Sequence, residues 1–340
     1  MKLIKGIILL LNFFVIALTA LAYISPHIDP MKIWVFSFFG LVFPLLLFLN
    51  IAFLIIWFII DKKKMFWSII ILLIGYNSIK KTISIHFDDK DANMGLTVLS
   101  FNMNQGAYLY KKKIKKGLFG DYVKSQNADI ILGQEINSKR IRNEMDSLYR
   151  YVKIEKNIGT GIFSKYSIVN SGQVDFQLNT NSCVWADIVI RKDTFRVYSV
   201  HFMSNQISKQ ATDLATDFGN EEDVDTKKVR EVLSRYKKYV QVRARQVKKV
   251  KKHVEKSPYP VILGGDFNDP SISFTYQQIS ELLKDAFVEK GLGMGVSYGG
   301  PIPFLRIDNI FVSDKIDVMS FKKLDDKFSD HFAVKAKLDI

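Results

Sequence analysis

Two long runs without a charged residue constrain what the first quarter of the chain can fold into. The 19 residues 6–24 and the 28 residues 33–60 contain no Asp, Glu, Lys or Arg. Because about 20 consecutive apolar residues cross a bilayer as a helix, we predict that both runs span a membrane. Gly40 and Pro44 favour a kink in the second span. A third uncharged run, the 15 residues 65–79, is marginal in length, so the chain is predicted to have two or three transmembrane helices.

The basic residues beside these runs predict how the chain is oriented. Lys2 and Lys5 precede the first run and Lys62–Lys64 follow the second, whereas Lys32 is the only lysine or arginine between them. Short loops rich in lysine and arginine lie on the cytoplasmic side, so the remainder of the chain is predicted on the extracytoplasmic, periplasmic side if the third run crosses. The first run also fits a signal peptide, because Ala20–Ala22 resembles a cleavage site, and cleavage there would give the same placement.

Beyond the apolar runs, the chain alternates short apolar segments with amphipathic ones, which is typical of a mixed α/β domain. Eight segments are predicted as strands: 96–102, 128–135, 160–165, 183–190, 195–202, 260–268, 306–313 and 332–340. Helices are expected near 111–126, 226–255 and 274–283. These strands exceed what one doubly wound sheet needs, so two packed sheets with helices outside are predicted. We place the membrane region in residues 1–85 and the α/β domain in residues 90–340.

The net charge bears on which binding partners suit the chain, and the cysteine count excludes an intramolecular disulfide. The net charge is +14, which suits polyanions or anionic lipid, although a solvated lysine-rich surface explains it equally well. Cys183 is the only cysteine, so no disulfide forms within the chain.

Polar side chains stand at the ends of most predicted strands. They are Asn102, Glu135, His201, Asp266 and Asn268, together with Asp308 inside "RIDNI" and Asp330 and His331 just before the last strand. Unpaired buried carboxylates are costly, so packing alone does not explain this pattern. We expect these acids, amides and histidines to converge on one site suited to metal or phosphate chemistry. Gly264 and Gly265, directly before Asp266, are expected to let backbone and phosphate approach closely.

The order of these motifs resembles a known family. "SFNMN", "ILGQE", "SVHF", "GGDFND", "RIDNI" and "SDHFAV" resemble the endonuclease/exonuclease/phosphatase superfamily, in its order and over essentially all of residues 96–340. Behind an N-terminal hydrophobic block, they are similar to membrane-anchored members from Bacteroidetes-type bacteria. The resemblance implies a four-layer α/β sandwich, in which two mixed sheets pack face to face between outer helices and the site lies at one end.

The resemblance also implies a cation site and contacts to substrate. Glu135 is implied as the leading ligand of Mg²⁺ or Mn²⁺, with Asn102 beside it and Asp330 as a further or water-mediated ligand, and hard cations of this kind prefer oxygen ligands. Asn104 matches a position that is often acidic in abasic-site endonucleases and is expected near the substrate. Lys165 replaces an arginine after "GTGIFS", so a phosphate contact there would keep the charge but lose bidentate geometry.

Five residues receive catalytic roles from the same resemblance. Asp308 and His331 match a dyad that contacts water or phosphate, with the carboxylate holding the imidazole in one tautomer. Asp266 is expected to orient or deprotonate the attacking water. Asn268 is expected to donate a hydrogen bond to the phosphate, and His201 to bind phosphate or protonate the leaving group.

The predicted function is therefore a membrane-anchored, divalent-metal-dependent phosphodiesterase acting on nucleic acid or on a phospholipid headgroup. Two alternatives stay open from the sequence. One is a phosphomonoesterase of inositol-type phosphates, and the other is an inactive module that binds nucleic acid or anionic lipid through its basic face. The predicted partners are the bilayer and the substrate, and the sequence indicates no protein partner.

Overall fold

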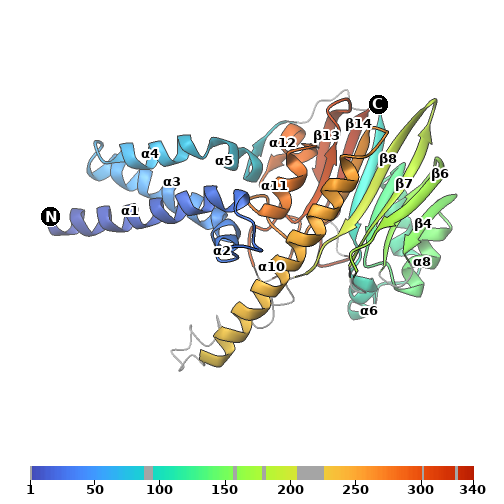
Figure 1. Ribbon diagram of the computed structural model, residues 1–340, viewed down its shortest axis with the longest axis horizontal. Coiled ribbons are helices and arrows are strands. Elements are labelled where there is room, and N and C mark those ends of the chain that lie inside the picture. Colours follow the sequence, from blue (N-terminus) through green and yellow to red (C-terminus); the bar gives the residue numbers. More distant parts are fainter. Residues whose placement is uncertain are drawn as a thin grey trace.

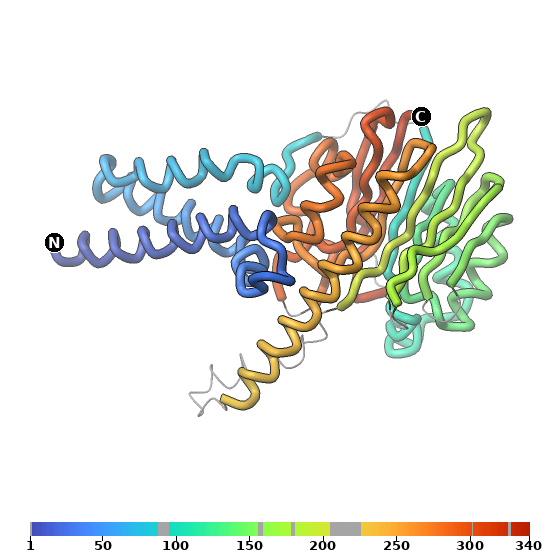
Figure 2. Tube along the Cα trace, viewed as in Figure 1, coloured from blue at the N-terminus to red at the C-terminus, as the bar shows by residue number. Residues whose placement is uncertain are grey.

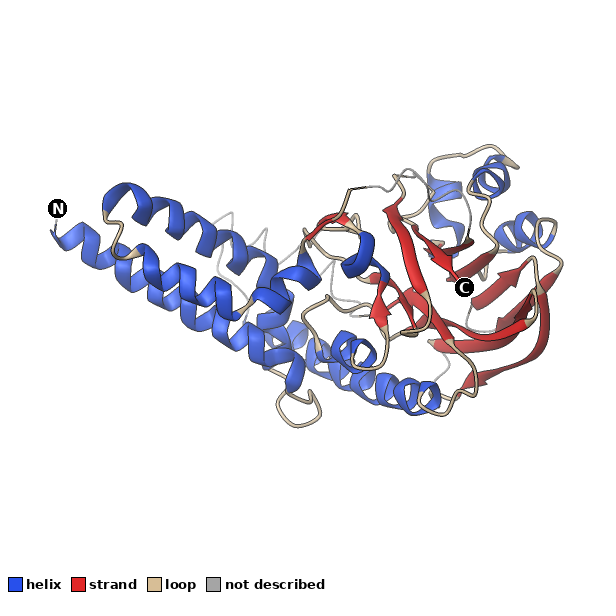
Figure 3. Cartoon of the chain, turned by 90° about the horizontal axis from the view of Figure 1, so that it is seen from above, coloured by secondary structure: helices blue, strands red, loops and turns tan. Residues whose placement is uncertain are grey.

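The computed structural model describes residues 2–87, 95–155, 159–177, 181–204, 226–300, 302–325 and 328–340. A bundle of N-terminal helices projects from an α/β domain, and the N-terminus lies at the far tip of the bundle (Figure 1, Figure 3). The predicted boundary between the two regions, residues 85–90, falls partly in residues 88–94, which lie outside the described ranges.

The bundle is built from the apolar runs. Its elements are α1 (Lys2–Ile24), the 3₁₀ turn η1 (Ser25–His27), α2 (Phe36–Leu41), α3 (Phe43–Ile60), α4 (Met65–Ile74) and α5 (Tyr76–Thr82). α1, α3 and α4 lie side by side, so the turn before α4 is at the far tip and the segment 25–42 is beside the α/β domain (Figure 1). Two helices, spanning residues 2–27 and 43–60, are long and apolar enough to cross a membrane.

The second and third apolar runs are each broken, which corrects the expectation of one helix per run. The run 33–60 divides at Val42, and α3 starts with Pro44 in its first turn, where the missing N–H of proline costs no hydrogen bond. The third run divides at Gly75, where a Cβ atom would lie 1.9 Å from the ring of Tyr23. The second helix long enough to cross a membrane is therefore 43–60, and α2 is a separate short helix.

Polar side chains inside the bundle pair with one another, while apolar side chains cover its surface. Asn12 donates to Ser68 Oγ at 3.1 Å and accepts from Trp57 Nε1 at 2.9 Å. Leu3 and Ile59 are each 77% exposed. The bundle thus exposes large apolar side chains over its surface while several polar side chains are buried inside it.

Two six-stranded sheets form the α/β domain. One has the order β13-β14-β2-β3-β5-β4 and the other β10-β12-β9-β8-β7-β6, while β1 and β11 form a separate pair. The strands are β1 (Ser84–Ile85), β2 (Leu96–Asn102), β3 (Ile130–Gln134), β4 (Tyr151–Glu155), β5 (Thr160–Ser164), β6 (Ser167–Val174), β7 (Ser182–Ile190), β8 (Asp193–His201), β9 (Val261–Asp266), β10 (Lys284–Asp285), β11 (Leu292–Gly293), β12 (Asp308–Val312), β13 (Asp317–Lys323) and β14 (Val334–Asp339). β2 and β3 pair in parallel, as do β8 and β9, and the other pairs are antiparallel, so both sheets are mixed.

Three apolar clusters separate four layers, which confirms the predicted sandwich. The first cluster fills the space between the two sheets, with Leu132 of β3 and Ala186 of β7 among its members. The second packs α10 (Thr226–Val254) and α11 (Phe274–Ser280) on the outer face of one sheet, and the third packs α7 (Leu118–Ser125) and α8 (Lys139–Asp146) on the other. The remaining helices within the described residues are η2 (Asn104–Gly106), α6 (Ala107–Lys111) and α12 (Ala286–Lys290). Figure 2 shows α10 and α11 beside the end of the bundle.

All eight predicted strands are present, and the unpredicted ones are mainly edge strands. β4, β6, β10 and β13 stand at the four sheet edges. β6 is mostly exposed or half-buried along its length, so it lacks the apolar run that marks an interior strand. The helix expected over 111–126 is divided into α6 and α7.

Candidate active site

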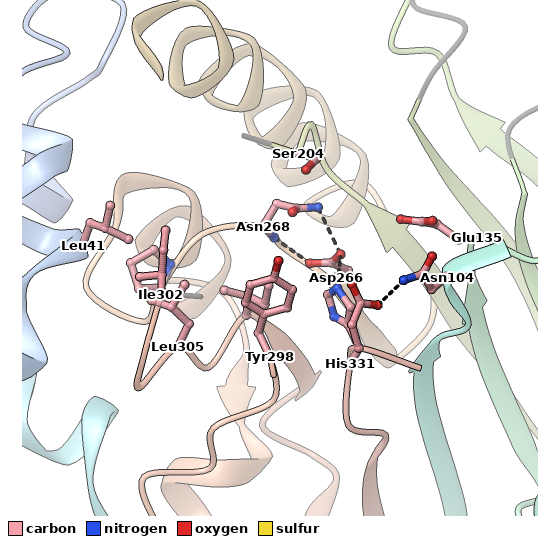
Figure 4. Close-up of a pocket in the computed structure, with 13 residues that line it drawn as sticks. Leu41, Asn104, Glu135, Ser204, Asp266, Asn268, Tyr298, Ile302, Leu305 and His331 are labelled. Carbon is pink, nitrogen blue, oxygen red and sulfur yellow. Dashed lines mark hydrogen bonds and ion pairs between the residues drawn. The ribbon is translucent and has the colours of Figure 1, made fainter. Parts of the chain in front are cut away.

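A cavity of about 170 Å³ opens at one end of the two sheets (Figure 4). It is lined by Leu41, Asn104, Glu135, Ser204, Asp266, Asn268, Pro270, Tyr298, Ile302, Leu305, Ile307, Asp330 and His331. Six of these lining residues were predicted from the sequence; they are Asn104, Glu135, Asp266, Asn268, Asp330 and His331. Three more, Asn102, His201 and Asp308, contact or neighbour those lining residues.

Strand register brings the polar strand ends to the same place. Asn102 pairs with Gln134 across the parallel strands β2 and β3, so Glu135 emerges beside Asn102. On the other sheet, Asp266 is the register partner of both His201 on β8 and Asp308 on β12. The two sheets face each other, and the two groups of strand ends meet between them.

Left-handed backbone marks three residues that line the cavity. Asn104, Glu135 and Asn268 have φ values of 44°, 52° and 51°. Asparagine tolerates this conformation, but glutamate adopts it rarely, and strained backbone of this kind is concentrated at functional sites. At Glu135 the left-handed turn ends the strand and directs the carboxylate into the cavity.

The two glycines before Asp266 serve strand packing rather than the approach of a phosphate. Gly265 has a φ of +146°, and a Cβ there would lie 1.9 Å from the carbonyl oxygen of Val200 on β8. A Cβ on Gly264 would lie 2.7 Å from Leu132 of the facing sheet. The expectation that they make room for substrate is thus corrected.

Asp266 is held in place by three N–H donors. Its Oδ1 accepts from the backbone N–H of Asn268 at 2.8 Å, and its Oδ2 accepts from the side chains of Asn268 at 3.0 Å and Asn102 at 2.9 Å. The side-chain nitrogen of Asn268 also donates to the carbonyl of Phe202 at 3.0 Å. Both amide hydrogens of Asn268 are thereby engaged, one of them with the carboxylate of Asp266.

His331 and Asp308 form a buried pair. Nδ1 of the imidazole lies 2.9 Å from Oδ2 of the carboxylate, and Nε2 lies 3.8 Å from Oδ2 of Asp266. Burial alone would lower the pKa of His331, but the charges of Asp308 and Asp266 outweigh burial and raise this pKa to about 10. Burial raises the pKa of Asp308 to about 6, although the neighbouring imidazole lowers it. The predicted dyad is therefore assembled, with Nδ1–H donating to the carboxylate.

His201 lies between the two halves of the site. Its Nε2 is 3.8 Å from Glu135 and 3.7 Å from Asp266, beyond hydrogen-bond distance. Neither ring nitrogen has a hydrogen-bond partner within the described ranges, and the residue is 5% exposed. Oδ1 of Asp308 is likewise buried without a partner there. Buried polar atoms of native proteins are usually paired, so these atoms indicate a place for a ligand.

Asp330 and Asn104 both line the cavity and contact each other. The side-chain nitrogen of Asn104 donates to Oδ1 of Asp330 at 2.5 Å. Ser329 donates to the carbonyl of Asn102 at 2.7 Å, which ties the last loop to the end of β2. The two predicted residues are thus adjacent, and Asn104 lies near Glu135 in Figure 4.

The donor set of the cavity fits a divalent cation. Glu135, Asp266 and Asp330 line it, and no lysine or arginine stands among its described lining residues. Asp266, Asp308 and His331 also offer ligand atoms within 4.8 Å of one another. The amide nitrogen of Asn102 donates to Asp266 and, at 3.3 Å, to Glu135, so this side chain links two carboxylates in the structure.

Lys165 lies outside this site, which corrects its predicted role. It follows β5, whose antiparallel pairing sets Ser164 opposite Ile130 at the start of β3. Its Nζ contacts Asn127 at 2.9 Å and Asp129 at 3.2 Å. Glu135 follows the other end of β3, a strand of five residues or roughly 17 Å, so Lys165 cannot contact a phosphate in the cavity.

Seven of the lining residues were not predicted from the sequence; they are Leu41, Ser204, Pro270, Tyr298, Ile302, Leu305 and Ile307. The ring of Tyr298 lies 5.1 Å from that of His331, measured between ring centroids. Tyr298 belongs to the glycine-rich loop "GLGMGVSYGG", whereas Ser204 and Leu41 carried no local signal. Leu41 comes from α2 of the helical bundle.

One family model of known function matches most of the α/β domain. The model described as the Endonuclease/Exonuclease/phosphatase family matches residues 99–331, and one described as a domain of unknown function matches residues 5–82. No curated protein matches the chain.

Solved structures agree with this match. An endonuclease/exonuclease/phosphatase family protein of Bacteroides thetaiotaomicron is 19% identical with a TM-score of 0.53, covering 73% of this chain and 99% of that one. A mannosyl-6-phosphatase of Bacteroides thetaiotaomicron VPI-5482 is 19% identical with a TM-score of 0.51, over 72% and 100% of the two chains. TDP2 of D. rerio, solved with a single-strand DNA product, is 15% identical with a TM-score of 0.52, over 73% and 100%. At these identities the likeness concerns the fold.

Proposed function

The chain belongs to the endonuclease/exonuclease/phosphatase family of phosphoester hydrolases, and from this premise we propose that it is a membrane-anchored, divalent-metal-dependent phosphodiesterase. Its substrate class is a phosphodiester of nucleic acid or of a phospholipid. Assembly of the dyad and the acidic residues in one cavity argues against the alternative of an inactive binding module.

One observation carries the proposal: three carboxylates line the cavity, and no lysine or arginine does so among the lining residues described. An anionic phosphate would be repelled there unless a cation offset the charge. We propose Glu135 and Asp330 as the residues that hold Mg²⁺ or Mn²⁺, with Asn102 beside Glu135. When bound, such a cation acts as a Lewis acid that stabilises charge on the phosphate.

The proposed roles of the remaining residues follow from their contacts. Nδ1 of His331 is engaged by Asp308, so Nε2 is the nitrogen left to contact water or phosphate. Asp266, fixed by its three donors, is placed to orient a water molecule and accept its proton. His201 has two unengaged nitrogens within the described ranges and suits binding of phosphate or protonation of the leaving oxygen. Asn104 is proposed as a substrate contact beside Asp330.

The side-chain distribution of the bundle supports membrane anchoring. A soluble core helix is mostly buried, but only 22% and 33% of the apolar windows in the two long helices are buried. A cleaved signal sequence would not need specific partners, yet Asn12 of α1 bonds to Ser68 and Trp57. Small polar residues that bond across helices are typical of membrane bundles. Both alternatives are therefore less consistent with the structure than retained helices.

We propose residues 1–85 as the anchor and 90–340 as the catalytic domain, held outside the cytoplasm. The N-terminus and the lysines at 62–64 share the far tip of the bundle, opposite the catalytic domain (Figure 1). Because positive residues favour the cytoplasmic side, this arrangement supports an extracytoplasmic catalytic domain. Reporter fusions at Lys63 and after Ile340 should report opposite sides, and agreement between them would contradict the proposed topology.

The test of the function is hydrolysis of bis-p-nitrophenyl phosphate by the full chain in detergent with Mg²⁺. We expect EDTA to abolish the activity, and Glu135→Gln to reduce it at least about 100-fold, because loss of a metal ligand removes the charge compensation for the phosphate. Lys165→Gln is the matched control, since that residue lies outside the site, and should retain full activity. Undiminished hydrolysis in excess EDTA would contradict the proposal, and a preference for the monoester p-nitrophenyl phosphate would favour a phosphomonoesterase.

A further inference from the structure

The cavity has a polar end and an apolar end. Figure 4 shows Glu135, Asn104 and His331 together, with Leu41, Ile302 and Leu305 gathered beyond Tyr298. The apolar end contains no group that the proposed chemistry uses. This end offers apolar contacts to a part of the substrate that does not react.

One apolar wall is supplied by the membrane region. Leu41 is the last residue of α2, and Gly40 before it is so close to the loop of Ile272 that a Cβ would lie 1.9 Å from the Ile272 carbonyl oxygen. Phe38 of the same helix stacks on Tyr236 of α10, with ring centroids 4.1 Å apart. α2 is thus seated firmly on the catalytic domain, and Leu41 is held at the cavity.

The opposite apolar wall leads to a spanning helix. Phe304, between Ile302 and Leu305, has a φ of +62° and is 43% exposed. Its ring centroid is 5.5 Å from that of Phe48 on α3. A bulky residue with left-handed backbone is strained, so the loop is held in a shape that turns an aromatic ring toward the bundle. The apolar end of the cavity is therefore continuous with the surface of the helices that we place in the bilayer.

From this geometry we infer that the substrate is an amphiphilic phosphoester resident in the membrane. Its phosphate lies among Asp266, Asn104 and His331, and its apolar group lies between Leu41 and Ile302. This inference rests on the proposed function, because it assigns the substrate class of the same site.

Nucleic acid fits this cavity less well. Proteins bind nucleic-acid phosphates mainly through lysine and arginine, and the described lining has neither. Single strands also bind by stacking of successive bases on several aromatic side chains, whereas Tyr298 is the only Phe, Tyr or Trp in that described lining. Aliphatic side chains at the far end provide burial for alkyl groups instead.

The test uses two diesters that differ only in their apolar group, methyl p-nitrophenyl phosphate and octyl p-nitrophenyl phosphate. The full chain is assayed with Mg²⁺ in phosphatidylcholine nanodiscs. Each methylene buried against the apolar wall should raise kcat/KM about fourfold. If about three methylenes are buried, the octyl ester should be preferred about 50-fold.

Variants locate the source of this preference. Leu41→Ser and Ile302→Ser should each reduce the ratio of octyl to methyl kcat/KM about tenfold, because each removes part of the apolar wall. Val35→Ser is the matched control, because Val35 adjoins α2, is 44% exposed and lies outside the lining; its ratio should stay at the wild-type value. If Leu41→Ser does not fold, as judged by its melting temperature, Ile302→Ser still tests the inference.

Three results would overturn the inference while leaving the proposed function intact. They are equal kcat/KM for the two esters, an equal loss for both esters in the Leu41 and Ile302 variants, and faster hydrolysis of a single-stranded DNA oligonucleotide than of the octyl ester. Failure to hydrolyse either ester or the oligonucleotide with Mg²⁺ would overturn the proposed function together with the inference.

Discussion

Asn12 of the bundle and the residues His201 and Asp308 beside the cavity are polar side chains buried in two different ways. In the bundle, buried Asn12 is paired with Ser68 and Trp57 by neutral hydrogen bonds. In the catalytic domain, buried His201 and Asp308 retain polar atoms without a partner in the described ranges. The first arrangement joins neighbouring helices, and the second leaves donors and acceptors for a ligand.

This difference distinguishes polar groups that stabilise the fold from polar groups that take part in binding or chemistry. A paired polar group contributes stability, and its removal should affect folding before activity. A group with unengaged atoms at the cavity contributes to chemistry, and its removal should affect turnover before folding. Variants in the two regions can therefore test the distinction.

The largest effect is expected at the dyad. Asp308→Asn removes the charge that stabilises the imidazolium of His331, and by analogy with other His–carboxylate pairs turnover should fall roughly 10³- to 10⁴-fold. His331→Ala should be about as damaging, and the double variant hardly worse than either single one, because the two residues act as a unit. Changing His201 should be separable and leave more activity. The measurements are turnover on bis-p-nitrophenyl phosphate and the melting temperature of each variant.

The pKa of His331 gives a second readout of the dyad. The folded-state pKa is raised from 6.5 to about 10, so the charged pair contributes stability that is fully present below about pH 6.5 and is lost as the pH rises through about 10. Asp308→Asn should lower this pKa, which NMR titration of the imidazole would detect without metal. If the losses of turnover in Asp308→Asn and His331→Ala multiply in the double variant, and the pKa of His331 is unchanged in Asp308→Asn, then Asp308 has only a structural role.

A smaller effect is expected in the bundle. Asn12→Ala leaves Trp57 and Ser68 without their partner and should lower the free energy of unfolding in detergent by about 1 kcal/mol, the magnitude typical of hydrogen bonds between membrane helices. Activity per folded molecule should be unchanged, since Asn12 lies far from the cavity. Leu10→Ala is the control, because Leu10 is 71% exposed and should cost less. A loss of turnover without a loss of stability would break the comparison between the regions.

The interior of the fold follows from the sequence, whereas its edges do not. β2, β3 and β9 are buried along their whole length, and their continuous apolar runs identify them. Edge strands such as β6 face solvent and carry polar residues, so their pairing depends on neighbours that are distant in the chain. The break between α2 and α3 at Val42 lies between Gly40 and Pro44, where the sequence favoured a kink, but hydropathy alone does not show that two separate helices result.

The site was largely predictable because its residues stand at strand ends, where register brings them together. Glu135, Asp266 and His331 needed only the order of the strands to be placed. Lys165 was misplaced because a motif does not say at which end of an antiparallel strand its last residue falls. Leu41 could not be predicted, since it reaches the cavity only through packing of the bundle on α10 and α11.

The central claim is that the carboxylate-lined cavity binds a divalent cation, and Mn²⁺ binding to the full chain measured by electron paramagnetic resonance tests it most directly. We expect saturable binding that Mg²⁺ displaces, at least about tenfold weaker binding in Glu135→Gln because a carboxylate ligand is lost, and wild-type binding in the control Lys165→Gln. Absence of saturable binding, or equal affinity in Glu135→Gln and the wild type, would contradict the account.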